Sequence, residues 1–279
     1  MTTKQKGILY TILSAVCFST GGLLIKLNTW SSMTICGLRS IWAFLIFLIY
    51  MIATKHPVRF NGKVLIGVLA NTLMSISFIM ANKMTTAANA IILQFTLPID
   101  IMLLSWIFAK KKPDKVSVIS ASISFLGILF FFLESLSTGG MAGNILAIAS
   151  GFFYAIIFLI KKIPGADFES SALISFALNF VIGIPFYLQE TNFGAVNVST
   201  GILQGVVQIG LAYMFLNAAL DKVPPVGASL LSMIEPILNP ILVAVFYGET
   251  IGPVSLVGAV IVLSSALYYN CASTSIEKS

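Results

Sequence analysis

Charged residues are scarce in this sequence: they make up 9% of its 279 residues, whereas 58% are hydrophobic. A soluble globular protein has about 25% charged residues, so a water-soluble domain of this size would lack the charge to cover its surface. The three cysteines are scattered through apolar runs and offer neither a disulfide framework nor a metal-ligand spacing. These absences exclude soluble, disordered and disulfide-rich classes and leave a polytopic membrane protein.

Histidine and catalytic motifs are scarcer still. The single histidine, His56, lies between two apolar runs, and neither an HExxH nor a GxxxxGK[ST] motif is present. We therefore expect no metal, no cofactor, no enzymatic activity and no nucleotide-driven pump within this chain. The net charge of +6 comes from basic residues in short gaps between the runs, which predicts contact with anionic lipid and not with a nucleic acid.

Ten apolar runs are long enough to cross a bilayer as helices, since a hydrocarbon core takes roughly 20 apolar helical residues. They are continuous and too long for the alternating strands of a membrane barrel. The runs cover residues 7–25, 33–54, 64–82, 87–109, 116–133, 144–160, 172–188, 201–220, 226–247 and 251–270. The longest connection is expected around residues 189–200. The sequence predicts an all-α integral membrane protein with ten transmembrane helices.

Basic residues predict the side of the membrane that each connection faces. With the N-terminus inside, 13 lysines and arginines are cytoplasmic, Lys26 and Lys83 are outside, and Arg39 lies within a span. We therefore predict a multi-pass protein of the cytoplasmic membrane with both termini in the cytoplasm.

The chain contains an internal repeat. At an offset of 138 residues, the matches include Ala90 with Ala228, Leu93 with Leu231 and Pro98 with Pro236. We predict one repeat over residues 1–136 and a second over 137–279, which form one structural unit. Each half holds five spans, an odd number, so the second half is inverted relative to the first. Inverted repeats are typical of secondary transporters, although duplicated helical bundles also occur in channels and membrane enzymes.

Charged side chains inside the runs mark a candidate site, because each costs about 2.5–3.5 kcal/mol on insertion scales. Three stand out: Arg39, Asp100 and Glu235. Glu235 is the candidate acid of a central cavity. Asp100 and Arg39 could instead pair with each other, and Arg39 is either a structural partner or a substrate contact.

Mid-span prolines predict kinks in the same runs. Pro98 and Pro236 remove helical bonds to the carbonyls of Gln94 and Ser232, and Pro240 removes one to the carbonyl of Pro236. Polar residues on neighbouring runs are expected to line the same cavity. The full set of candidate substrate-binding or coupling residues is Glu235, Asp100, Asn239, Ser232, Gln94, Asn71, Tyr154, Gln208 and Tyr213.

Hydrogen bonding between helices is the alternative role for each uncharged member of this set. On an ideal helix, Gln204 and Gln208 would face in a different direction from Tyr213 and Asn217.

The sequence resembles the EamA-type members of the drug/metabolite transporter (DMT) superfamily. The firmest motif is Ile234-Glu235-Pro236, followed by Gly248-Glu249 and a last run rich in small residues. The first half departs from the family, because Lys110-Lys111-Lys112 replaces a Gly-Glu-basic ending and Asp100 has no standard counterpart. The resemblance implies a ten-helix inverted-repeat fold with a central cavity, and movement of small metabolites, often amino acids or amphiphilic compounds and often outward.

Our leading hypothesis is a secondary transporter, not driven by ATP, that exports a small polar or amphiphilic metabolite such as an amino acid or amine by alternating access. The expected partners are this solute, the lipid bilayer and protons as one candidate coupling ion, with the chain a monomer or homodimer. Two alternatives stay open: an intramembrane enzyme that uses Asp100 and Glu235, and a passive channel.

Overall fold

The computed structural model describes the whole chain except residues 86, 111, 134–139, 248–251 and 277–279. The described residues form helices and connections without a strand, which confirms the all-α prediction. In chain order the helices are α1 Thr3–Leu27, α2 Ser32–Ala53, α3 Gly62–Met84, α4 Ala87–Gln94, α5 Leu97–Ala109, α6 Lys115–Phe132, α7 Met141–Leu159, η2 Ile160–Lys162, α8 Phe168–Tyr187, α9 Ala195–Leu203, η3 Gln204–Leu211, α10 Ala212–Leu220, α11 Pro225–Ser232, α12 Glu235–Tyr247 and α13 Pro253–Ile276.

Several helices begin at a polar side chain that caps their free N–H groups. Thr2 and Gln5 form a capping box at α1, and the Asn61 side chain accepts from the first N–H groups of α3. Asp114 and Asp167 cap α6 and α8 in the same way. Such caps stabilise a helix start by about 1 kcal/mol, and they place the first turn of each helix where an apolar run begins.

Within the part of the chain that the structure describes, eight helical stretches are long and apolar enough to cross a membrane. They are Thr3–Ile25, Ser32–Ala53, Gly62–Met84, Ala90–Phe108, Met141–Lys162, Phe168–Tyr187, Ala195–Leu220 and Pro225–Phe246. Two further apolar helices, Lys115–Phe130 and Leu256–Tyr269, are shorter than these stretches. The connection expected around residues 189–200 is shorter than predicted, because α9 already begins at Ala195.

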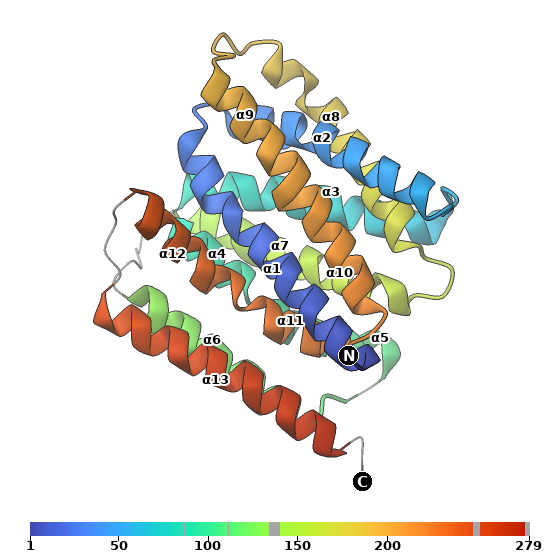
Figure 1. Cartoon of the computed structure of the whole chain (residues 1–279), viewed down its shortest axis with the longest axis vertical. Coiled ribbons are helices and arrows are strands. Elements are labelled where there is room, and N and C mark those ends of the chain that lie inside the picture. Colours follow the sequence, from blue (N-terminus) through green and yellow to red (C-terminus); the bar gives the residue numbers. More distant parts are fainter. Residues whose placement is uncertain (86, 111, 134–139, 248–251, 277–279) are drawn as a thin grey trace.

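The two halves of the chain interleave in the fold. Helix α3 packs on α7, α2 packs on α8, and α1 lies against η3, α10, α11 and α12. Figure 1 shows α6 and α13 side by side along one edge, while α1 crosses the middle of the bundle. The largest apolar core therefore contains residues from both halves, including Phe18, Phe47, Phe158 and Leu216.

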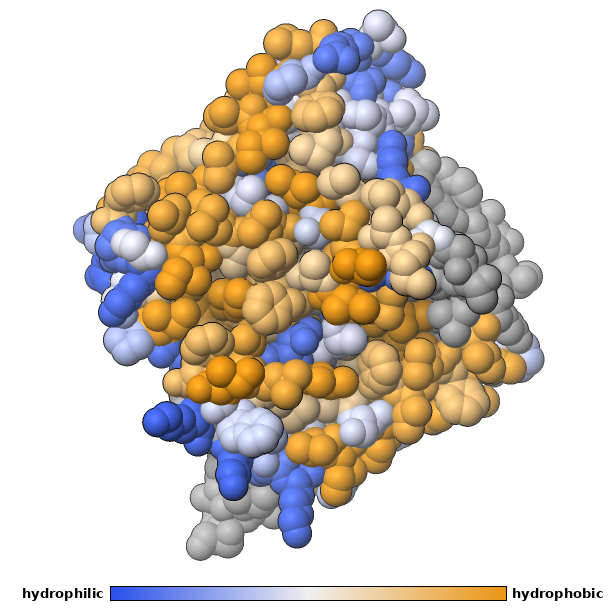
Figure 2. All heavy atoms as spheres, turned by 180° about the vertical axis from the view of Figure 1, so that it is seen from behind, coloured by the Kyte–Doolittle hydropathy of each residue, from blue (hydrophilic) through white to orange (hydrophobic). Residues whose placement is uncertain are grey.

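Large apolar side chains cover much of the outer surface. Phe108 is 80% exposed and Ile107 63%, and Figure 2 shows hydrophobic residues over most of one face, with hydrophilic residues mainly toward its margins. Apolar patches of this extent mark contact with a membrane or a partner, which agrees with the multi-pass prediction.

Hydrogen bonds between connections define two ends of the helical bundle. At one end, called the Asn28 end, residues 28–34 contact residues 190–200. The Asn28 side chain bonds to the Asn197 carbonyl at 3.1 Å and the Trp30 indole to the Asn192 carbonyl at 2.7 Å.

The other end, called the His56 end, joins residues 54–63, 160–170 and 217–223. His56 lies 2.9 Å from Asp167, and the Arg59 N–H donates to Ser170 at 2.9 Å. Bonds of both ends join segments of the first half to segments of the second, so the two halves meet at each end of the bundle.

Candidate functional site

Two membrane helices are interrupted at equivalent places in the two halves. Helix α4 ends at Gln94 and α5 starts at Leu97, while α11 ends at Ser232 and α12 starts at Glu235. The backbone hydrogen bonds around the two breaks match at the 138-residue offset. In the first break the Thr96 N–H donates to the Leu93 carbonyl and the Ile99 N–H to the Thr96 carbonyl. In the second, the Ile234 N–H donates to the Leu231 carbonyl and the Ile237 N–H to the Ile234 carbonyl.

Pro98 and Pro236 explain the breaks, because a proline has no N–H for the carbonyl four residues earlier. Both prolines are buried. Main-chain carbonyls freed in this way are tolerated inside a membrane where they face protein or a cavity. The kink of the first half fits against Gly151 of α7, where an added methyl group would lie 2.6 Å from the Gln94 oxygen. Pro240 is within α12, and its side chain lies outside the described part of the structure.

Glu235 is the first residue of α12 and lies directly at the second break. The residue as a whole is half-buried, but its Oε2 is fully buried and has no hydrogen-bond partner. Its carboxylate interacts electrostatically with the hydroxyls of Tyr154 and Tyr213. A buried carboxylate without a partner is costly, so this position is the strongest candidate for contact with a solute or a proton.

Asp100 has a simpler environment. Its carboxylate accepts a 2.9 Å bond from the Thr96 hydroxyl at the start of α5, and the side chain is half-buried. Within the described residues, no hydrogen bond joins it to Glu235 and no ion pair joins it to Arg39. An acid in the first turn also favours a helix N-terminus, which gives Asp100 a structural role at the break.

Arg39 is buried in α2 with 4% exposure, and its Nη1 has no hydrogen-bond partner. The described ion pairs join His56 to Asp167 and Lys161 to Asp221, and none includes this guanidinium. The electrostatic neighbours of Arg39 include Tyr213, which also interacts with Glu235. The structure thus brings a positive and a negative group, each with an unpaired buried atom, near one tyrosine.

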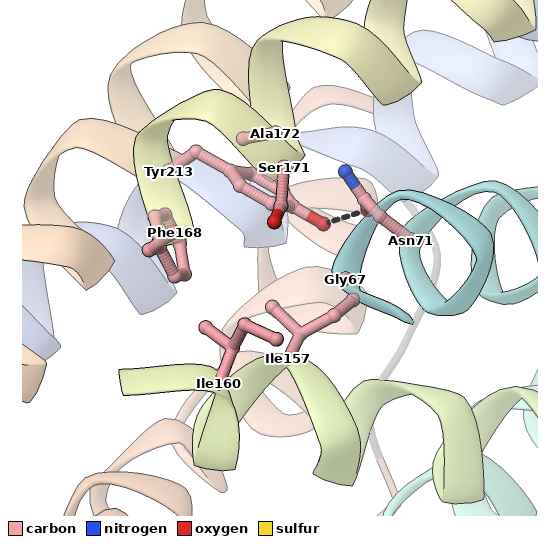
Figure 3. Close-up of a pocket in the computed structure, with 8 residues that line it drawn as sticks. All are labelled: Gly67, Asn71, Ile157, Ile160, Phe168, Ser171, Ala172 and Tyr213. Carbon is pink, nitrogen blue, oxygen red and sulfur yellow. Dashed lines mark hydrogen bonds between the residues drawn. The ribbon is translucent and has the colours of Figure 1, made fainter. Parts of the chain in front are cut away.

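Tyr213, Asn71 and Ser175 connect three helices in one polar chain. The Tyr213 hydroxyl donates to the Asn71 carbonyl oxygen, and the Asn71 amide donates to the Ser175 hydroxyl. Figure 3 shows the Tyr213–Asn71 bond beside the residues that line a small cavity. The cavity lies between α3, α7, α8 and α10, and its lining includes Gly67, Ser171 and Ala172.

At about 10 Å³ this cavity has room for about one water molecule, far less than the roughly 300–1,000 Å³ of typical ligand pockets. It lies near the first turns of α3 and α8, toward the His56 end of the bundle. Aromatic rings surround Tyr213, including Phe18 at a centroid distance of 5.7 Å and Phe176 at 5.3 Å. Tyr154 belongs to the same aromatic group, with its ring 5.0 Å from Phe158.

Gln94 and Ser232 have local partners instead of cavity contacts. Both are buried; the Gln94 amide lies 3.9 Å from the Met74 sulfur and the Ser232 hydroxyl donates to the Ala228 carbonyl at 3.0 Å. Their roles at the site remain predictions.

Gln208 and Asn239 reach α1 from two different helices. A methyl group added to Gly21 would overlap the Gln208 amide, and one added to Gly22 would overlap the Asn239 amide. No pattern in the sequence selects these glycines, because only the folded chain shows what lies against them.

The eighth predicted span contains a change of helix type. Gln204–Leu211 is a π-helix, which takes more residues per turn than an α-helix because its bonds run from i to i+5. Nine residues separate Gln204 from Tyr213, about 2.5 α-helical turns, which would place them on opposite sides. In the structure Gln204, Gln208, Tyr213 and Asn217 are all buried.

A hydrogen-bonded network closes the His56 end. The Asn217 amide donates to Glu169 at 2.8 Å and to Tyr50 at 3.3 Å, and Lys161 bonds to Asp221 at 2.7 Å. Sequence reasoning missed this network, because its members lie near the ends of separate runs.

His56, Asp167 and Glu169 bring their side-chain ligand atoms within 4.8 Å of one another. Asp167 already contacts His56 at 2.9 Å and accepts a hydrogen bond from the Ser170 N–H at 2.7 Å. Burial alone would raise the pKa of Asp167, but the bonds from Ser170 and His56 outweigh it and hold this pKa below its usual range. The cluster therefore acts as a helix cap and a contact between loops.

Comparison with known proteins places this chain in a family. The profile of the EamA-like transporter family matches residues 5–133 and 141–271. The chain belongs to this family of transporters.

Relatives and a solved structure agree with that placement. An uncharacterized transporter of Archaeoglobus fulgidus is 25% identical over 262 residues, which are 92% of this chain and 93% of that protein. The uncharacterized transporter YwfM of Bacillus subtilis is 23% identical, with 90% and 81% covered. A protein solved by crystallography has the same fold, with a TM-score of 0.84 at 14% identity over 96% of this chain and 98% of that one.

Proposed function

We propose that this EamA-family protein is a secondary transporter of a small polar or amphiphilic metabolite, such as an amino acid or an amine, and that it works by alternating access. In this proposal ten helices span the membrane, both termini are cytoplasmic and the solute leaves the cell. The observation that carries the proposal is the carboxylate of Glu235, whose buried Oε2 has no partner at a break in a membrane helix.

Glu235 would hold a cationic group of the solute or a proton. A charge removed from water needs a counter-charge or hydrogen bonds, and the described surroundings of Oε2 supply neither. An ammonium group supplies both, because it carries three N–H donors and a positive charge. The same carboxylate would be free to take up a proton after the solute leaves, which makes protons the candidate coupling ion.

Arg39 extends the proposal to zwitterions. Its guanidinium is an opposite charge that, like Glu235, interacts with Tyr213, and it too has an unpaired buried N–H. Guanidinium groups bind carboxylates in a planar, two-pronged geometry. A solute that carries both an ammonium and a carboxylate would therefore satisfy Glu235 and Arg39 together, whereas a simple amine would satisfy only Glu235.

The small cavity lies on the side from which an exported solute would enter. The cavity beside Asn71 and Tyr213 is toward the His56 end, and basic residues predict that this end faces the cytoplasm. A solute from the cytoplasm would thus reach the cavity before it reaches the Asn28 end.

The test is transport by purified protein in proteoliposomes, with a radiolabelled panel of amino acids, amines and neutral solutes. We expect Glu235→Gln to reduce kcat/KM for cationic and zwitterionic solutes by about 100-fold, the loss expected when a buried charge pair is broken. Arg39→Gln should reduce transport of amino acids and spare amines. Asp114→Asn, at the start of α6 and outside the bonded ends of the bundle, is the matched control and should transport like wild type.

Wild-type transport by Glu235→Gln would dismiss the role of this acid. Equal losses for amines and amino acids in Arg39→Gln would dismiss the zwitterion. Solute flux at channel rates would replace the carrier by a passive pore.

A further inference from the structure

Two consecutive glycines of α1 face amide side chains of the second half. Gly21 lies against Gln208 of η3, and Gly22 lies against Asn239 of α12, so closely that a single methyl group on either glycine would overlap the facing amide. In both cases the atoms in the way belong to the far end of a side chain and not to backbone. Gly21–Gly22, called the glycine notch, therefore seats two amides that come from different helices.

The glycine notch lies on one side of the central acid. Asn239 follows Glu235 by four residues, about one helical turn. Helix α11 begins at the His56 end, so α12, which continues it, runs away from that end. Helix α1 runs in the same direction, from the contact of Gly7 with Val223 to Asn28 at the opposite end. The two seated amides thus stand between Glu235 and the Asn28 end of the bundle.

The seated amides are held by shape more than by bonds. Gln208 is buried and its Oε1 has no hydrogen-bond partner, and the described hydrogen bonds include none from the Asn239 side chain. The His56 end differs, because there Asn217, Glu169, Lys161 and Asp221 are joined by short bonds. A contact that depends on fit separates without breaking bonds of its own, while the bonds of Asn28 to Asn197 and Thr200 hold the end of α1 beyond the notch.

Steric fit of this kind also makes the contact sensitive to small changes. Protein interiors are close-packed, and an extra methyl group in a filled space forces neighbouring groups to move. Gly21 and Gly22 have no side chain at the two positions of α1 that face the amides, so this helix can lie close to η3 and α12.

We infer that Gly21 and Gly22 are positioning residues for a gate: they seat the amides of Gln208 and Asn239 over Glu235 and so close the site toward the Asn28 end. When α1 moves away, the amides leave the notch and line the route between Glu235 and that side. The inference rests on the proposed function only in taking Glu235 as the centre of the site.

The test measures access to position 235 itself. Glu235→Cys supplies a reporter thiol after Cys17, Cys36 and Cys271 are changed to alanine. A membrane-impermeant thiol reagent is applied to each face of sealed vesicles in turn, without any substrate. Gly22→Ala and Gly21→Ala are compared with Gly62→Ala, a control glycine in α3 with no atom within 4 Å of an added methyl group.

We expect Gly22→Ala and Gly21→Ala to speed labelling by about tenfold from the face of the Asn28 end only, as overpacking shifts the population away from the closed state. Gly62→Ala should label like the parent protein. Unchanged labelling in both notch variants, or an equal increase from both faces, would overturn the gate, since the second result indicates general loosening.

Asn239→Ala keeps the inference testable if the glycine variants do not fold, because it empties the notch instead of overfilling it. Asn239→Ala should also speed labelling from the face of the Asn28 end. The double variant Gly22→Ala/Asn239→Ala should label little faster than Asn239→Ala alone. Full additivity of the two changes would contradict a shared contact. In the Glu235 background, Gly22→Ala should lower kcat more than it changes KM. Labelling needs no solute, so a failed transport assay and a failed gate are separate results.

Discussion

Single side chains determine what this protein can bind within the membrane. Glu235 and Arg39 are the two charges whose described surroundings leave a buried atom unpaired, whereas Asp100 is bonded to Thr96. The sequence identifies all three as costly groups inside apolar runs. It leaves open whether Asp100 pairs with Arg39, because that depends on how α2 and α5 are placed in space.

One residue outside the spans makes stability depend on pH. The bonds from Ser170 and His56 hold the pKa of Asp167 below its usual range in spite of burial. Its folded pKa is thus below its unfolded value of about 3.9, so its stabilisation is present above that value and is lost as the pH falls through the folded pKa.

We therefore predict that Asp167→Asn lowers the free energy of unfolding by about 1 kcal/mol at neutral pH, with the deficit shrinking in acid, where the wild-type carboxyl is also neutral. Thermal unfolding in detergent between pH 7 and pH 3 measures both. A deficit that stays constant over this range would mean that the charge of Asp167 contributes nothing.

Two helix breaks and the π-helix η3 shape the candidate site. Mid-span prolines allow the two breaks to be predicted, and both appear at the expected places in α4–α5 and α11–α12. The π-helix η3 has no such marker, so the change of helix type between Leu203 and Ala212 could not be read from spacing. Tertiary contacts of α1 and α2 with η3 lie beyond any local pattern.

The break of the first half should be intolerant of extra volume at its contact with α7. Gly151→Ala would place a methyl group 2.6 Å from the Gln94 carbonyl oxygen, a backbone atom, and we expect it to cost about 1–3 kcal/mol of stability. The thermal midpoint in detergent should fall for Gly151→Ala and not for Gly62→Ala. Equal midpoints for the two variants would show that the kink adapts freely.

Across the whole molecule, the sequence predicts architecture better than detail. Long apolar runs, sparse charge and the repeat predict the all-helical membrane class, because each depends on composition over many residues. The candidate site is predicted less completely: the side chains are found, but the glycine notch, the His56-end network and the unpaired state of Arg39 arise only where distant helices meet.

The inverted arrangement of the two halves underlies the proposed mechanism. Five spans in each half require that the connection after α2 and the connection before α7 face opposite sides of the membrane. The hydrogen bonds of the structure agree with such a division, because the connection after α2 bonds to residues 160–170 at the His56 end, whereas Asn144 near the start of α7 bonds to Thr85 at the other end of α3.

Cysteine labelling of two exposed positions tests this arrangement most directly. Phe60 precedes α3 with 78% exposure, and Met141 begins α7 with 71% exposure. In cells that express Phe60→Cys or Met141→Cys without the native cysteines, an impermeant reagent should label the thiol at position 141 from outside and the thiol at position 60 only after the membrane is opened. Labelling of both positions from the same side would contradict the inverted repeat and the transport mechanism that depends on it.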